Sequence, residues 1–155
     1  MTSTSDHARI SPPPPLVFLG YLLSALLLQW AVPFPLPWAL PLRVLGALLL
    51  VGGFLLGAAA VREMRKMHTT PDPRQPVTAL VTRGPYGFTR NPIYLGFLLI
   101  YFGCTLLANT LWGLLLSPFL IGTITRWVIH AEEVYLAERF PDEYQAYLGR
   151  VRQWL

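Results

Sequence analysis

Four long apolar segments constrain the fold of this chain more than any other feature. They cover residues 16–32, 39–61, 93–108 and 111–129. A helix needs about 20 apolar residues to cross the roughly 30 Å of hydrocarbon in a bilayer, and each segment comes near that length. Residues 16–32 and 93–108 are on the short side. We expect either that the bilayer is locally thinned around these helices or that the helix at 93–108 gains length from Pro92 and its polar flank. The sequence therefore predicts an all-α integral membrane protein with about four transmembrane helices.

Composition supports the same class of protein. Of the 155 residues, 54% are hydrophobic and 13% are charged, which is more apolar surface than one small soluble core requires. The net charge of +4 is carried beside the apolar segments, not in a separate basic domain. We therefore expect a membrane as partner and no nucleic acid. The single cysteine, Cys104, forms no disulfide within the chain, and we expect no metal ion.

The remaining sequence divides around these segments. Residues 1–15 form a proline-rich lead-in, and residues 16–155 form one membrane domain with a long loop at 62–92 and a C-terminal helical region at 130–155. In that last region apolar and tyrosine residues recur with the period of an amphipathic helix, at Tyr144, Tyr147, Leu148 and Val151. This predicted helix begins near Pro141 and either lies on the membrane surface or covers a cytoplasmic cavity.

Small residues predict how some of the helices pack. Gly53 and Gly57 form a small-xxx-small face in the second segment, a pattern that lets helix backbones approach closely. Gly103 is placed to admit a neighbouring helix in the third segment. We therefore expect close helix contacts at these glycines.

Basic residues predict the orientation in the membrane. The loop at 62–92 holds six of them and the C-terminal region holds three, whereas the connections at 33–38 and 109–110 hold none. Loops that are rich in lysine and arginine remain in the cytoplasm. We therefore expect both termini, the long loop and any site beside them to be cytoplasmic.

A polar stretch at membrane depth indicates a functional site. The sequence VTALVTRGPYGFTRNPIYLG at residues 77–96 runs directly into the third apolar segment. The connection at 109–110 is too short for anything but an antiparallel hairpin, so Arg90 lies at the same depth as Glu132 and Glu133. Charged side chains at membrane depth are costly and are usually functional. The alternative is an interfacial salt bridge from Arg90 or Arg126 to a glutamate.

Helix geometry refines this prediction. Adjacent residues of a helix point about 100° apart, so Glu132 and Glu133 have different roles and one of them faces the bundle. Asn91 is expected at the N-cap of the third helix, with Pro92 at its first position. His130 has two interpretations, as an interfacial side chain or as part of the site.

These motifs closely resemble the isoprenylcysteine carboxyl methyltransferase family, including its small bacterial members, and more distantly the phospholipid N-methyltransferases. The resemblance spans residues 69–155 and rests on LVTRGPYGFTRNPIYLG followed by EEVYLAERFPDEYQAYLGRVRQWL. The GPY turn, the R-[HN]-P-x-Y-x-G run, the EE pair and the F-x-x-E-Y-x-x-Y tail occur in the family's order. The first two apolar segments match only in hydrophobic character.

The resemblance implies S-adenosylmethionine as methyl donor, bound under the C-terminal helix at the cytoplasmic face of a bacterial inner membrane. Our candidate catalytic residues are Arg90, Asn91 and Glu133. Glu132 would pair with the cationic groups of the donor, since charge-assisted hydrogen bonds are the strong ones. Gly84 and Gly96 would permit close backbone approach to the donor. The expected donor-binding residues are Thr78, Ala79, Leu80, Val81, Gly84, Tyr86, Asn91, Pro92, Ile93, Tyr94, Gly96 and Glu132.

Three departures from the family pattern concern the methyl acceptor. Asn91 stands where the R-H-P form has histidine, and Gly87 stands where bacterial relatives carry a basic residue. Val128 occupies the position at which eukaryotic members have a substrate-binding arginine. Arg126 and His130 flank that position and are our candidates for contacts with the substrate.

The predicted function is methyl transfer to a lipophilic acceptor that carries a carboxylate or a thiolate. Such a group arrives already ionised, and its reaction with a sulfonium removes two opposite charges, which a site of low dielectric favours. The first alternative is N-methylation of phosphatidylethanolamine. The second is a catalytically silent membrane scaffold that keeps the helical hairpin for packing.

Overall fold

The structure is a computed structural model that describes residues 13–37, 39–70 and 77–155. Throughout these ranges the chain forms helices and connecting segments without a β-strand, so the all-α prediction is confirmed. In chain order the elements are α1 (Pro14–Ala31), α2 (Ala39–Lys66), the 3₁₀ helix η1 (Gly84–Gly87), α3 (Pro92–Leu107), α4 (Leu111–Ile124), the π-helical turn η2 (Thr125–Ile129), α5 (His130–Arg139) and α6 (Pro141–Leu148).

Three helices of the described chain have the length and apolar composition of a membrane span. They are α1, the stretch Leu40–Lys66 of α2, and the continuous helix Leu111–Arg139 that comprises α4, η2 and α5. The remaining predicted span corresponds to α3, which is apolar but has only 16 residues. The structure thus supports an integral membrane protein, and the count of four spans stays a prediction.

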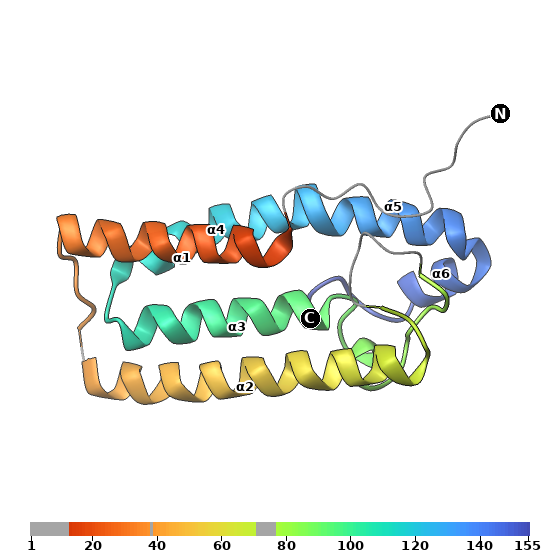
Figure 1. Cartoon of the computed structure of the whole chain (residues 1–155), viewed down its shortest axis with the longest axis horizontal. Helices are drawn as coiled ribbons and strands as arrows, with labels where there is room; N and C mark the ends of the chain where they lie inside the picture. The colour runs from red at the N-terminus through yellow and green to blue at the C-terminus, as the bar shows by residue number, and fades with distance from the viewer. Residues whose placement is uncertain (1–12, 38, 71–76) are drawn as a thin grey trace.

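Helices α1 to α4 lie side by side with their long axes roughly aligned (Figure 1). Helix α2 packs along α3, and α1 packs along α4. At one end of the bundle the two short connections meet, where the N–H of Leu111 donates to the carbonyl of Phe34 at 2.9 Å. The opposite end carries the long connection together with α5 and α6, so the polar motifs gather there (Figure 1).

Glycines permit the close packing of α2 on α3. A Cβ atom added to Gly53 would lie 2.6 Å from the carbonyl oxygen of Gly96, and one added to Gly103 would lie 2.8 Å from that of Gly46. Side chains larger than hydrogen would therefore force the two backbones apart. The prediction of close contacts is confirmed at Gly53 and Gly103, whereas a Cβ atom added to Gly57 would have no atom within 4 Å. The role of Gly46 was not predicted.

Aromatic and apolar side chains join α1 to the other helices. The rings of Phe18 and Phe97 lie 5.2 Å apart, and the hydroxyls of Tyr21 and Thr123 are 2.9 Å apart. The outer surface is also apolar, since Trp30 is 85% exposed and many leucines of α1 and α2 face outward. Lipid would cover such a surface in a membrane.

Several helix bounds differ from the predicted segment bounds. Helix α2 continues to Lys66, so the long loop is shorter than the predicted 62–92. Pro14 and Pro15 belong to α1 and not to the lead-in, because proline is compatible with the first turn of a helix. Helix α6 ends at Leu148, so Val151 is buried in a non-helical tail. The predicted residues 1–12 of the lead-in lie outside the described residues.

Candidate functional site

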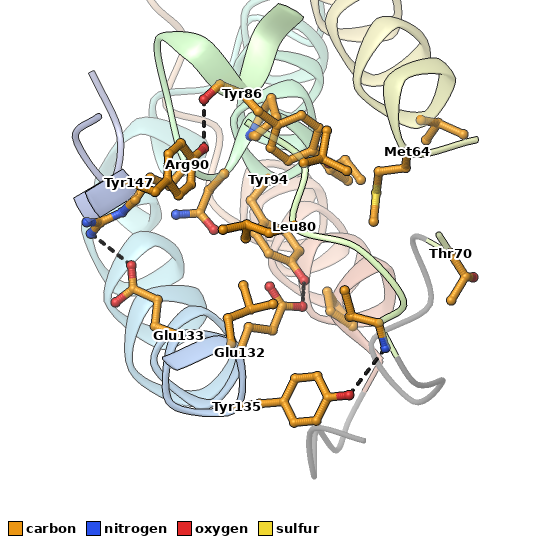
Figure 2. Close-up of a pocket in the computed structure, with 18 of the residues that line it drawn as sticks. Met64, Thr70, Leu80, Tyr86, Arg90, Tyr94, Glu132, Glu133, Tyr135 and Tyr147 are labelled. Carbon is orange, nitrogen blue, oxygen red and sulfur yellow. Dashed lines mark hydrogen bonds and ion pairs between the residues drawn. The ribbon is translucent and has the colours of Figure 1, made fainter. Parts of the chain in front are cut away.

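A cavity of about 490 Å³ opens among the helix ends at the end of the bundle that carries α5 and α6. Its walls come from the starts of α1 and α3, the end of α2, residues 77–81, α5 and α6. Figure 2 shows tyrosines, carboxylates and one arginine on one side of the space, with Met64 and Thr70 on another.

Two pairs of polar side chains connect α3 and its lead-in to α5. An Nη atom of Arg90 donates to Oε1 of Glu133 at 2.9 Å, and these side chains are 14% and 22% exposed. The hydroxyl of Tyr94 donates to Oε1 of Glu132 at 2.5 Å (Figure 2). The two adjacent glutamates therefore contact different partners, and both line the cavity.

The turn η2 precedes the two glutamates. In this π-helical turn the N–H of His130 donates to the carbonyl of Thr125, five residues earlier, instead of four as in an α-helix. A single π-turn accommodates one extra residue and changes which side chains share a face. The orientation of Glu132 and Glu133 relative to α4 therefore depends on this turn.

Helix α6 forms one wall of the cavity. Tyr144 and Tyr147 are buried and line it, and the hydroxyl of Tyr147 donates to the carbonyl of Tyr86 at 2.7 Å. Burial raises the pKa of Tyr144 to about 12 and also raises the pKa of Tyr86 and of Tyr147. These phenols stay protonated and can donate hydrogen bonds. Of the two predicted positions for this helix, the cavity cover is the one that these contacts fit.

The C-terminal tail holds the segment that precedes α3. The backbone N–H of Arg90 donates to the carbonyl of Arg152 at 3.0 Å. The carbonyl of Gln153 accepts from Oγ1 of Thr89 at 3.1 Å and from Nδ2 of Asn91 at 3.0 Å. Asn91 does precede the first residue of α3, but its side chain makes no capping hydrogen bond. The capping role predicted for this side chain is therefore replaced by a contact with the tail.

Most of the residues predicted for the site meet at the cavity. Three of the predicted donor-binding residues do not line it. Thr78 donates from Oγ1 to the carbonyl of His68 at 2.9 Å, and Gly96 packs against α2. Gly84 has a φ of +60° and faces Glu63, so its lack of a side chain serves the turn. The predicted residues that do line the cavity are Ala79, Leu80, Val81, Tyr86, Arg90, Asn91, Pro92, Ile93, Tyr94, Glu132 and Glu133.

The two predicted substrate contacts lie elsewhere. Arg126 and His130 are both exposed, and neither lines the cavity. Val128, which separates them, is 2% exposed and packs in the core. The structure thus brings the glutamates to the cavity but not the two basic residues that precede them on the same helix.

Sequence reasoning did not assign the remaining wall to the site. The prolines at the start of α1 carry no chemical signal. The C-terminal helix was predicted as one possible cover of a cavity, but its individual tyrosines were not assigned to the site. The additional lining residues are Pro13, Pro14, Pro15, Val61, Met64, Thr70, Val77, Phe97, Tyr135, Leu136, Tyr144 and Tyr147.

This arrangement suits a ligand that has both polar and apolar parts. Arg90, Glu132 and Glu133 are the only charged residues among the described lining residues, and the Nε atom of Arg90 is buried without a hydrogen-bond partner in the described structure. No group of three or more potential metal ligands occurs among the described residues.

Comparison with known proteins gives three findings. Residues 42–143 match the family described as Phospholipid methyltransferase. Over 104 residues the chain is 30% identical to a Protein-S-isoprenylcysteine O-methyltransferase of Schizosaccharomyces pombe, a match that covers 66% of this chain and 44% of that protein. Over 64 residues it is 42% identical to an uncharacterized protein of Haemophilus influenzae, covering 41% of this chain and 100% of that protein. The chain therefore spans less than half of the S. pombe protein, and no solved structure matches it.

Proposed function

The chain belongs to the phospholipid methyltransferase family, and from this premise we propose that it transfers a methyl group from S-adenosylmethionine to a lipophilic acceptor. The observation that carries the proposal is the cavity wall formed by Glu132, Tyr94 and Arg90. The three side chains reach it from α5, α3 and the segment that precedes α3. Such a wall offers an acidic partner for a cationic group of the methyl donor and a basic partner for its carboxylate.

The polar wall fits the donor group by group. S-adenosylmethionine carries a sulfonium, an ammonium, a carboxylate and an adenine ring. Glu132 would bind a cationic group, and the buried, unpartnered Nε of Arg90 would bind the carboxylate. Tyr86 and Tyr147 supply aromatic surface for the adenine or the sulfonium. The donor brings the electrophilic methyl group, and these residues would orient it.

The apolar part of the cavity lining supports a lipophilic acceptor. Pro13, Val61, Met64 and Phe97 line the cavity with apolar side chains from α2, α3 and the residues at the start of α1. Apolar ligand surface gains about 25 cal/mol for each Å² removed from water. Binding on this side would hold the nucleophile of the acceptor near the polar wall. Such positioning is worth about 7–11 kcal/mol in well-oriented reactions, and most of the rate gain would come from it.

The chemical class of the acceptor has two candidates. A carboxylate or thiolate needs no base and loses its charge in the reaction, which favours it on chemical grounds. However, Arg126 and His130 are exposed outside the cavity, and Arg90 is paired with Glu133. With the remaining Nε of Arg90 assigned to the carboxylate of the donor, the described wall offers no further cation to an anionic acceptor. This favours the second candidate, the amine of a phospholipid.

The proposed location is the cytoplasmic face of a bacterial inner membrane. The described basic residues Arg62, Arg65 and Arg139 lie in α2 and α5, and Arg83 directly precedes η1, all at the end of the bundle that carries the cavity. Cytoplasmic ends of membrane helices are rich in such residues. The methyl donor is made in the cytoplasm, so this orientation would give it access to the site.

Donor binding is tested by calorimetry on the detergent-solubilised protein. Replacement of Glu132 by alanine should weaken S-adenosylmethionine binding by about 1.5–3 kcal/mol, because a charged hydrogen bond is lost. Glu143→Ala is the matched control, since Glu143 is exposed on α6 and does not line the cavity. Equal affinity of both variants would contradict the assignment of Glu132, and no binding by the wild type would favour the scaffold alternative.

The acceptor is identified with a labelled methyl donor. Purified protein is incubated with the donor and either a prenylated thiol carboxylic acid or phosphatidylethanolamine. Base-labile label in the acid indicates a methyl ester, whereas base-stable label in the phospholipid indicates N-methylation. Label in neither lipid, despite donor binding, would rule out both acceptor classes.

A further inference from the structure

The charges on the cavity wall do not balance. Among the described lining residues, Arg90 is the one cation, and Glu132 and Glu133 are the anions. Arg90 pairs with Glu133 at 2.9 Å. Glu132 accepts a hydrogen bond from the neutral hydroxyl of Tyr94 and has no cation partner in the described structure. The wall therefore carries one carboxylate without a counterion.

A carboxylate in such a place favours a cationic ligand. An uncompensated charge that is partly removed from water raises the free energy of the empty site, and a ligand of opposite charge lowers it. The exposed Arg126 and His130 do not line the cavity, so they supply no counterion there. The tyrosine faces add further attraction for a cation.

We propose that Glu132 makes the site prefer the cationic methyl donor over its neutral product, so that loss of charge in the reaction promotes product release. This inference rests on the proposed function. S-adenosylmethionine has a net charge of +1, from a sulfonium, an ammonium and a carboxylate. S-adenosylhomocysteine keeps the last two groups and is neutral.

The charge change follows from the reaction. A lone pair of the acceptor forms a bond to the methyl carbon, and the bond from that carbon to sulfur breaks. The electron pair of the broken bond stays on sulfur, which becomes a neutral thioether. An anionic acceptor becomes a neutral ester or thioether, whereas an amine acceptor also gives up a proton to solvent. In either case the cofactor product no longer compensates Glu132.

Binding measurements with three ligands test this selectivity without turnover. Calorimetry on the full chain in detergent compares S-adenosylmethionine, S-adenosylhomocysteine and sinefungin, a cationic analogue with an amine in place of the methylated sulfur. We expect the two cationic ligands to bind at least about tenfold more tightly than the neutral one, which corresponds to about 1.4 kcal/mol. The wild-type protein alone can therefore refute the inference, if the neutral product binds as tightly as the donor.

A variant that removes the charge of Glu132 then tests whether this charge causes the preference for cationic ligands. Glu132→Gln keeps the shape and one acceptor oxygen, and should reduce the preference to about twofold or less by weakening the cationic ligands most. Glu138→Gln is the matched control, because Glu138 is exposed on the same helix and does not line the cavity. A uniform loss of affinity for all three ligands in Glu132→Gln would overturn the inference, since Glu132 would then contact a group common to all of them. Failure of the wild type to bind any ligand would instead reject the proposed function.

Discussion

The C-terminal tail should be necessary for donor binding although its side chains carry no reactive group. Truncation after Val151 removes residues 152–155, and with them the carbonyls that accept hydrogen bonds from Thr89, Arg90 and Asn91. Arg90 reaches Glu133 from this segment. Loss of the tail should therefore release the arginine from its position in the cavity wall.

The magnitude follows from the contacts that are lost. Three hydrogen bonds contribute about 0.5–1.5 kcal/mol each, and water can replace part of this once the tail is absent. Trp154 is partly buried against the main hydrophobic core, which adds about 1–2 kcal/mol. We expect truncation to lower the free energy of unfolding by about 2–4 kcal/mol. Donor affinity should fall at least tenfold, or by about 1.4 kcal/mol, because Arg90 loses its anchor.

Thermal unfolding in detergent and calorimetry with S-adenosylmethionine measure the two effects separately. Removal of Leu155 alone should change neither quantity, since this side chain is 73% exposed. Gln153→Ala should also leave the free energy of unfolding and the donor affinity nearly unchanged, because the backbone carbonyl and not the side chain accepts the hydrogen bonds. The reasoning is refuted if the protein truncated after Val151 binds the donor as tightly as the full chain, or if Gln153→Ala costs as much as the truncation.

Two further predictions concern packing and orientation. Gly96→Ala should lower the free energy of unfolding by about 1–3 kcal/mol, because the new methyl would lie 2.9 Å from the carbonyl oxygen of Gly53. Gly52→Ala is the control and should not lower this free energy, because there is open space around its Cβ. Equal melting temperatures for these two variants would contradict the packing. A cysteine at position 74, introduced as Arg74→Cys in a Cys104→Ser background, should react with a membrane-impermeant thiol reagent only from the cytoplasmic side, because the loop that contains it is rich in basic residues. Labelling from outside intact cells would reverse the proposed orientation.

Local sequence features predicted much of the helical framework. Apolar length located all four long helices to within a few residues at most ends, and Pro92 and Pro141 each begin a helix as predicted. The short connection at 109–110 correctly implied that the polar residues before α3 meet those of α5. These inferences succeed because hydrophobicity, proline geometry and loop length act within a few residues of the chain.

The direction in which each side chain points around its helix axis was harder to predict. Arg126 and His130 were candidates for substrate contacts because they flank Val128, but both side chains are exposed and lie outside the cavity. The π-helical turn η2 lies in this part of the helix. An α-helical period extrapolated across a π-turn errs by about one residue, or about 100°. The local sequence does not predict that π-helical turn.

The sequence by itself therefore determined that this is an all-α membrane protein with a polar cluster at one end of its bundle. The tertiary structure decided how that cluster becomes a cavity: prolines at the start of α1 and tyrosines of α6 complete its wall, and the carbonyl of Gln153 holds Asn91. These contacts join residues that are far apart in the chain. They depend on backbone carbonyls and on packing geometry, which residue type does not encode locally.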